Sequence, residues 1–127
     1  MHEYSLACDI IENVISTAEL NNAKEVKEIT LGVGKLTHVN PEQILFCMET
    51  LVEDTIARGA RIIIQDIYPD MECECGFSEN GEHFYTTGDI STDDIRAFLE
   101  VPCPACGKIL HASGGMEIII QSIDIEQ

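Results

Sequence analysis

Two cysteine pairs are the residues in this sequence best suited to chemistry. Cys73 and Cys75 flank one residue, Cys103 and Cys106 flank two, a glycine follows each pair, and 27 residues lie between the pairs. Four Cys thiolates bind Zn²⁺ as a closed tetrahedron, and the glycines permit tight turns that aim backbone N–H groups at sulfur. The spacing therefore predicts a structural zinc site. Iron in the same thiolates, as in a rubredoxin-like electron carrier, is the alternative that this donor set leaves open.

His2 is the second residue whose type and position suggest metal chemistry. Its imidazole, its own backbone nitrogen and the amino group of Met1 can chelate one ion together. Nitrogen donors of this kind favour square-planar Ni²⁺ or Cu²⁺, and the neighbouring Glu3 could support the site. A histidine near a chain end can equally be an ordinary solvated side chain, so its position alone leaves both interpretations open.

The other cysteines and histidines fit ordinary structural roles better. Cys8 and Cys47 fall on expected helices, where small buried thiols are common. His38 and His111 fit solvated or capping histidines better than metal ligands. The sequence has no Gly-rich phosphate loop and no Ser/His/Asp spacing, so we do not expect an enzyme.

Helical periodicity predicts the two elements that would position these residues. Apolar side chains recur at helical spacing over residues 4–20, and Asn21-Asn22 suit the turn that follows. A second helix is expected to begin at Asn40-Pro41, with Asn as N-cap and Pro at the first helical position. Its apolar stripe predicts that it continues to about Gly59.

Alternating and isoleucine-rich stretches predict three strands, over residues 26–33, 61–67 and 116–125. In the third strand, Ile119, Ile123 and Ile125 are expected on the face that the helices cover, opposite Ser122 and Asp124.

The order of these elements predicts an α+β fold, in which two helices pack on a three-stranded sheet. Residues 1–69, completed by 114–127, would form this α/β domain, which contains His2. Residues 70–113 would form a small zinc-ribbon-like insert between strands two and three, with a short helix at 91–99.

Charge and composition narrow the functional classes. Seven basic and 23 acidic residues give a net charge of −16, which repels phosphate backbones and argues against binding nucleic acid. The charge favours basic protein partners instead. No apolar run is long enough for a membrane span, and the first residues lack the basic start of a signal peptide. We therefore expect a cytoplasmic protein, where cysteines serve as thiols and metal ligands.

Several motifs, taken in order, resemble those of the HypA/HybF family of nickel chaperones. The resemblance covers nearly the whole chain, and an opening Met-His-Glu combined with a four-cysteine insert is a specific combination. Besides the two cysteine pairs, the matching motifs are Met1-His2-Glu3-Tyr4-Ser5-Leu6, Gly32-Val33-Gly34-Lys35-Leu36, Pro41-Glu42, Gly59-Ala60 and Gly114-Gly115-Met116-Glu117.

The resemblance implies an assembly factor for nickel–iron hydrogenase. Such a factor binds Ni²⁺ through Met1 and His2 and passes it, with a GTPase partner, to the large subunit of the hydrogenase. A monomer or weak homodimer is expected. A zinc-ribbon adaptor that only binds proteins is the alternative from another functional class, and substitution of His2 would leave its activity intact.

The resemblance also implies a role for each matching residue. Glu3 would support the nickel site or bind a partner, and His83, between the cysteine pairs, would be either an additional nickel ligand or a surface histidine. This chain departs from the family in its Cys-x-Cys first pair, where most members have Cys-x-x-Cys, and in Asn40, where some have Asp. The implied zinc ligands are Cys73, Cys75, Cys103 and Cys106.

Overall fold

The structure, a computed structural model, describes residues 2–37, 39–86 and 101–127. The chain divides into two compact units. Unit 1 comprises Met1–Val33, Val39–Gln65 and Ile118–Gln127, and unit 2 comprises Gly34–His38 and Asp66–Glu117. Within the described ranges, no helix has the length and apolar character needed to cross a bilayer.

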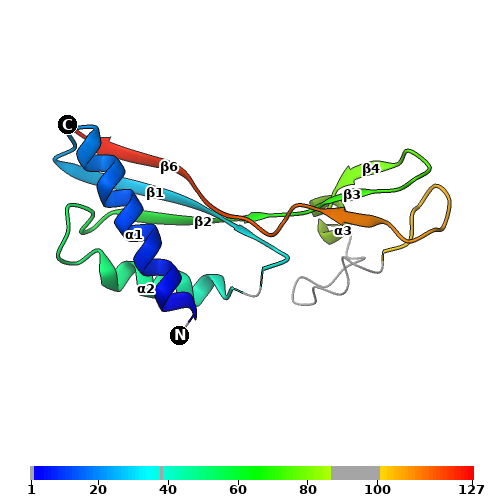
Figure 1. Ribbon diagram of the computed structural model, residues 1–127, viewed down its shortest axis with the longest axis horizontal. Helices are drawn as coiled ribbons and strands as arrows, with labels where there is room; N and C mark the ends of the chain where they lie inside the picture. Colours follow the sequence, from blue (N-terminus) through cyan, green and yellow to red (C-terminus); the bar gives the residue numbers. More distant parts are fainter. Residues whose placement is uncertain (1, 38, 87–100) are drawn as a thin grey trace. The chain divides into compact units, whose positions relative to one another are not determined.

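Unit 1 consists of two helices packed on a three-stranded sheet (Figure 1). The central strand β1 has β2 on one side and β6, antiparallel to it, on the other. The predicted α+β fold, with two helices on three strands, is confirmed. In chain order the elements are α1 (His2–Leu20), β1 (Glu25–Gly34), α2 (Pro41–Leu51), β2 (Arg61–Ile67) and β6 (Ile118–Glu126).

Helix α1 packs on the sheet through one apolar stripe and ends where the sequence predicts. The amide Nδ2 of Asn21 donates to the Thr17 carbonyl oxygen at 2.8 Å, and Asn22 adopts a φ of 57°. This left-handed conformation, which Asn tolerates, turns the chain out of the helix. The buried residues of the stripe are Ala7, Ile10, Ile11, Val14 and Ala18.

Helix α2 begins as the sequence predicts. The side chain of Asn40 accepts hydrogen bonds from the backbone N–H groups of Glu42 at 3.0 Å and Gln43 at 3.2 Å. Pro41 occupies the first turn, where its missing N–H is not needed. Asn40 is therefore the N-cap of α2.

Helix α2 ends earlier than predicted. It stops at Leu51, and residues 52–59 form turns, so the predicted continuation to Gly59 is wrong. The hydroxyl of Thr55 donates to the Val52 carbonyl oxygen at 2.8 Å and accepts from the Ala57 N–H at 3.0 Å. The Thr55 side chain thus replaces helical backbone partners, which the apolar pattern does not reveal.

One face of the sheet is apolar and meets the helices, and a bulge in β6 decides which isoleucines belong to it. Gln121 has no partner on β1, so β6 has one residue more than β1 between two consecutive pairs of the ladder. The extra residue reverses the alternation of side chains beyond it. Ile123 and Ile125 pack against the core of unit 1, whereas Ile119 is 46% exposed. The prediction that all three share the covered face is therefore wrong for Ile119.

Unit 2 contains a second small sheet, which the sequence analysis did not predict. β3 (Asp70–Glu72) pairs antiparallel with β4 (Ser78–Asn80) and with β5 (His111–Ser113), and α3 (Glu82–Thr86) follows β4. Strands of three residues show too little alternation to be recognised in a sequence. The helix predicted at 91–99 lies outside the described residues. The buried core of unit 2 is Leu36, Met71, Phe84, Val101, Cys103 and Leu110.

Three separate chain segments lie side by side in unit 2. The N–H of Gly34 donates to the Glu117 carbonyl oxygen at 2.7 Å, and the N–H of Lys35 donates to the Ile67 carbonyl oxygen at 2.8 Å. A Cβ at position 34 would collide with the carbonyl oxygen of Gly115. This close approach of two backbones is the reason for a glycine at position 34.

Candidate metal centres

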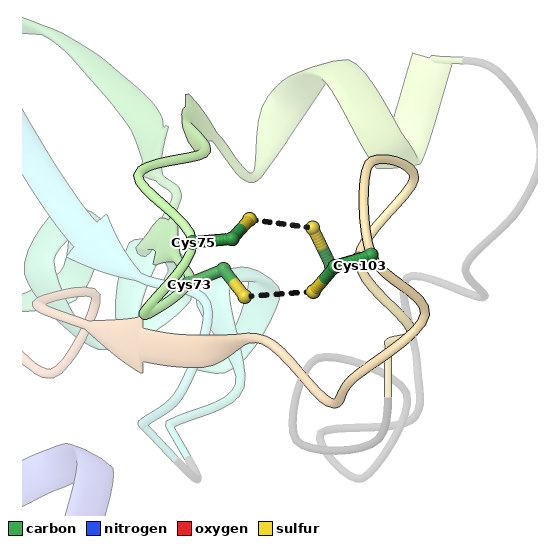
Figure 2. A group of neighbouring side chains, drawn as sticks. Cys73, Cys75 and Cys103 are labelled. Carbon is green, nitrogen blue, oxygen red and sulfur yellow. Dashed lines mark hydrogen bonds between the residues drawn. The ribbon is translucent and has the colours of Figure 1, made fainter.

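Four thiols of unit 2 converge on one point. The sulfur atoms of Cys73, Cys75, Cys103 and Cys106 all lie within 4.8 Å of one another. Cys73 lies 3.4 Å from Cys106 and Cys75 lies 3.7 Å from Cys103, sulfur to sulfur; Figure 2 shows Cys73 and Cys75 facing Cys103 across the site. Sulfurs bound at about 2.3 Å to one tetrahedral zinc would stand roughly 3.8 Å apart. The four sulfurs therefore fit a single ion, and the short Cys73-x-Cys75 pair brings both of its thiols to it.

Each cysteine pair lies in a turn closed by its glycine. The N–H of Gly76 donates to the Cys73 carbonyl oxygen at 3.0 Å, and the N–H of Gly107 donates to the Cys103 carbonyl oxygen at 2.8 Å. Gly76 and Gly107 have φ values of 99° and 82°, in the left-handed region that favours glycine. The backbone N–H of Ala105 points at the Cys103 sulfur, 3.4 Å away. The turns predicted at both glycines are confirmed.

The thiols of the cluster differ in how readily they ionise. Burial disfavours the thiolate of Cys103, but the N–H groups of Cys106 and Ala105 and the neighbouring thiols stabilise it and lower its pKa to about 7. The N–H of Lys108 favours the thiolate of Cys106, but hydrogen bonds to the other thiols and burial together raise its pKa to about 12. A thiolate and a protonated thiol thus lie side by side in the absence of a metal, and a cation would replace the protons they share.

The four sulfur donors of this cluster suit a metal ion that stays bound. Four sulfur donors would fill a tetrahedral coordination sphere and leave no open position for a substrate or water. Soft thiolate ligands suit zinc or iron rather than magnesium or calcium. Cys103 also belongs to the buried core of unit 2, so an ion held here would join that core to both turns.

The N-terminal candidate site is described in part. Helix α1 begins at His2, and Met1 and the His2 side chain lie outside the described structure. Glu3 Oε2 accepts a hydrogen bond from the backbone N–H of Asn40 at 3.3 Å. Because Asn40 caps α2, this contact joins the first residues of the two helices.

The remaining histidines lie apart from the four thiols or outside the description. His83 is on α3, where its Nε2 lies 3.4 Å from Glu79 Oε2, and its ring packs edge-on against Phe84. His111 is an exposed residue of β5. His38 is not among the described residues.

The sequence analysis missed an apolar groove beside the start of α1. Phe46 on α2 is 71% exposed at this groove. It lies off the apolar stripe that buries Ile44 and Met48, and an aromatic residue in that position was the signal available in the sequence. Cys8 and Cys47, predicted to be buried, are only half-buried. The groove has a volume of about 720 Å³ and is lined by Tyr4, Asn40, Glu42, Gln43, Phe46 and Cys47.

Nearly the whole chain is similar to known proteins. The family model described as "Hydrogenase/urease nickel incorporation, metallochaperone, hypA" matches residues 1–125. The hydrogenase maturation factor HypA of Methanosarcina mazei is 44% identical, with 99% of this chain and 93% of that protein aligned. The corresponding factor of Methanothermobacter thermautotrophicus is 40% identical, with 100% and 98% aligned.

The fold is similar to solved structures of more distant sequence. The solution structure of the Ni metallochaperone HypA from Helicobacter pylori matches with a TM-score of 0.60 and 19% identity, over 97% of this chain and 96% of that chain. A second, titled "Solution structure of HypA protein", matches with a TM-score of 0.64 and 20% identity, over 99% and 97%. At these identities the likeness concerns the fold.

Proposed function

The chain belongs to the HypA family of hydrogenase and urease nickel-incorporation metallochaperones, and we propose that it binds Ni²⁺ at its N-terminus and delivers it, with a GTPase partner, to the large subunit of nickel–iron hydrogenase. Members of this family are metallochaperones and not enzymes. The observation that carries the proposal is His2, at the first position of α1, in a chain that matches the family over residues 1–125.

The nickel site would use the first two residues. The Met1 amine, the His2 backbone nitrogen and the His2 imidazole supply nitrogen donors of the type that favours square-planar Ni²⁺. The first N–H groups of a helix have no intrahelical carbonyl partner, so the backbone nitrogen of His2 is free of the α1 ladder. Glu3 would support this site because its carboxylate holds the start of α1 to Asn40.

Cys73, Cys75, Cys103 and Cys106 would hold a structural zinc ion. Support comes from the spacing of the sulfurs and from a donor set that closes the coordination sphere. A closed site retains its ion, whereas an open N-terminal chelate can give its ion up. The two centres would therefore have different roles: zinc would stabilise the fold, and nickel would be bound for delivery.

We infer the client from the names of the relatives and the compartment from the cysteines. The relatives are named as hydrogenase maturation factors, which favours a hydrogenase over a urease as the client and implies contact with the maturation machinery. All six cysteines are free thiols, as expected in the reducing cytoplasm.

A nickel titration of untagged protein tests the proposal, because any added N-terminal residue would alter the amine ligand. We expect about one zinc per chain in every variant and about one Ni²⁺ in the wild type. His2→Ala should weaken nickel binding at least about tenfold, because the imidazole donor is lost and only the Met1 amine and the backbone nitrogen of residue 2 remain. His111→Ala, which removes an exposed histidine of β5, is the matched control.

Other results of the same titration would contradict parts of the proposal. Nickel affinity that is the same in His2→Ala and in the wild type would reject the N-terminal site. Iron in place of zinc would favour the electron-carrier alternative. His83→Ala belongs in the same titration: a weaker nickel affinity would assign His83 as an additional ligand, and an unchanged one would leave it as the partner of Glu79.

A further inference from the structure

The apolar groove beside the start of α1 takes no part in the proposed nickel and zinc sites. Phe46 is 71% exposed and Tyr4 49% exposed at a groove of about 720 Å³. Residues of both helices line the groove, with Tyr4 on α1 and Phe46 on α2. Exposed aromatic side chains beside a preformed hollow are typical of protein interaction sites, where aromatics supply much of the binding energy.

The helices that form the groove carry charge of one sign. Helices α1 and α2 together contain six carboxylates and no lysine or arginine. Acidic surfaces attract cationic partners and repel acidic ones, which sets both the rate of encounter and the choice of partner. The carboxylates are Glu3, Asp9, Glu12, Glu19, Glu42 and Glu49.

The spacing along α2 defines the shape of the partner. Glu42 precedes Phe46 by four residues and Glu49 follows it by three, and all three are exposed, so they form one stripe on the helix. A segment with an aliphatic side chain and a lysine or arginine about one turn to either side matches this stripe. Side chains at that spacing share one face of an α-helix.

The residues that line the groove exclude another mode of binding. They come from α1, α2 and the N-cap of α2, and none belongs to a strand. Addition of a β-strand needs a free sheet edge, so an extended segment could not bind here in that way, whereas a helix can lay its apolar face in such a groove. We propose that this groove docks a basic amphipathic helix of a partner protein.

Docking here would place the partner beside the nickel site, since Tyr4 is two residues from His2. That consequence rests on the proposed function; the groove, the exposed Phe46 and the acidic stripe do not. The partner's aliphatic side chain would enter between Tyr4 and Phe46, while its cations would face Glu42 and Glu49.

A synthetic peptide tests the inference directly. The probe is a labelled helical peptide of about 16 residues, with a central leucine and lysines four residues before and three residues after it. Its binding to the full-length protein is followed by fluorescence anisotropy at about 0.15 M salt, where nonspecific charge attraction is screened. Phe46→Ala should weaken binding at least about tenfold. Leu20→Ala, which removes an exposed apolar side chain at the far end of α1, should leave it unchanged.

Charge variants give a second test that does not depend on Phe46. Glu42→Lys, at the groove, should weaken binding by about fivefold, and Glu19→Lys, which makes the same charge change at the other end of α1, by less than about twofold. A peptide with serine in place of leucine should bind at least about tenfold more weakly.

Three results would overturn the inference. Phe46→Ala and Leu20→Ala could bind the peptide equally well, or the leucine and serine peptides could do so, which would reduce the effect to general charge attraction. Phe46→Ala could instead convert a homodimer to a monomer in sedimentation, which would make the groove an interface between copies of this chain. His2→Ala separates the two proposals, because it should lose nickel and keep the peptide, whereas Phe46→Ala should keep nickel and lose the peptide.

Discussion

At the scale of single residues, Glu3 links the starts of two helices through one hydrogen bond. Its carboxylate accepts from the Asn40 N–H at 3.3 Å. We expect Glu3→Ala to lower the free energy of unfolding by about 1 kcal/mol, because the amide loses its partner. Glu3→Gln should be nearly neutral, because the Gln side-chain oxygen can still accept. Urea denaturation of both variants measures the difference.

Nickel titration of the same pair separates two roles for Glu3. If Glu3 only positions the start of α1, Glu3→Gln should bind nickel as the wild type does and Glu3→Ala more weakly. Equal losses in both variants would contradict a positioning role and assign the negative charge itself to the nickel site.

The lowered pKa of the Cys103 thiol predicts how zinc binding depends on pH. In the metal-free cluster its pKa is lowered from 9.0 to about 7, so it is a thiolate above pH 7 and a thiol below. Its ionisation therefore stabilises the folded cluster above its unfolded pKa, and that stabilisation is lost as the pH falls through about 7. Zinc that binds to an already folded cluster must displace this additional proton below pH 7, so proton release per zinc would increase by about one from pH 8 to pH 6. The thiols of a metal-free unit 2 that is unfolded would instead release about four protons at both pH values.

Calorimetry of zinc binding in two buffers of different protonation enthalpy measures this release. Zinc affinity should also fall more steeply with pH below 7 than above it. A release that is the same at pH 6 and pH 8 would mean that Cys103 has its unfolded pKa before zinc binds, so that the cluster forms only with its ion.

At the scale of elements, Gly34 marks a point where three chain segments meet without room for a side chain. The atom that a Cβ would strike is the backbone carbonyl oxygen of Gly115, which cannot rotate away as a side chain could. We expect Gly34→Ala to cost about 3 kcal/mol or more in unfolding free energy. Gly59→Ala is the control, because nothing lies within 4 Å of its Cβ and only its φ of 78° opposes alanine. Its cost should be about 1 kcal/mol, and equal costs for the two variants would contradict the steric explanation.

The elements also show what could be read from the sequence and what could not. The apolar stripe of α1, the Asn40 cap and the long strands of unit 1 are local patterns, so periodicity identified them. The end of α2 depends on the Thr55 hydroxyl, and the exposure of Ile119 depends on a bulge at Gln121. Both are set by hydrogen bonds between particular groups, which periodicity does not record.

In the candidate sites, too, local patterns could be read from the sequence and tertiary contacts could not. Cysteine spacing predicted which four thiols meet, because turn-forming glycines and Cys pairs are local signals. Three-residue strands such as β3 owe their existence to pairing with distant segments, so the sequence did not predict the sheet beside the cysteines. The groove was missed because it needs residues from two helices, Tyr4 and Phe46, whose proximity only the tertiary structure reveals.

At the scale of the whole molecule, the two units differ in the means that stabilise them. The main buried cluster of unit 1 has fourteen side chains, and that of unit 2 has six, among the residues that the structure describes. Small domains with few buried apolar residues commonly need a metal or a disulfide to fold, and all six cysteines are free thiols. The metal in the four-cysteine cluster should therefore be required by unit 2 alone.

Removal of the metal should accordingly unfold half of the molecule and spare the other half. A strong chelator should abolish the dispersed amide signals of β5 residues such as Ala112, while those of Val14 in α1 and Ile29 in β1 persist. Most of the helical circular dichroism should survive, because the two long helices α1 and α2 belong to unit 1. Zinc added back should restore the lost signals. Simultaneous loss of both sets would show that the two units fold as one cooperative body, and retention of both would show that the core of unit 2 suffices without an ion.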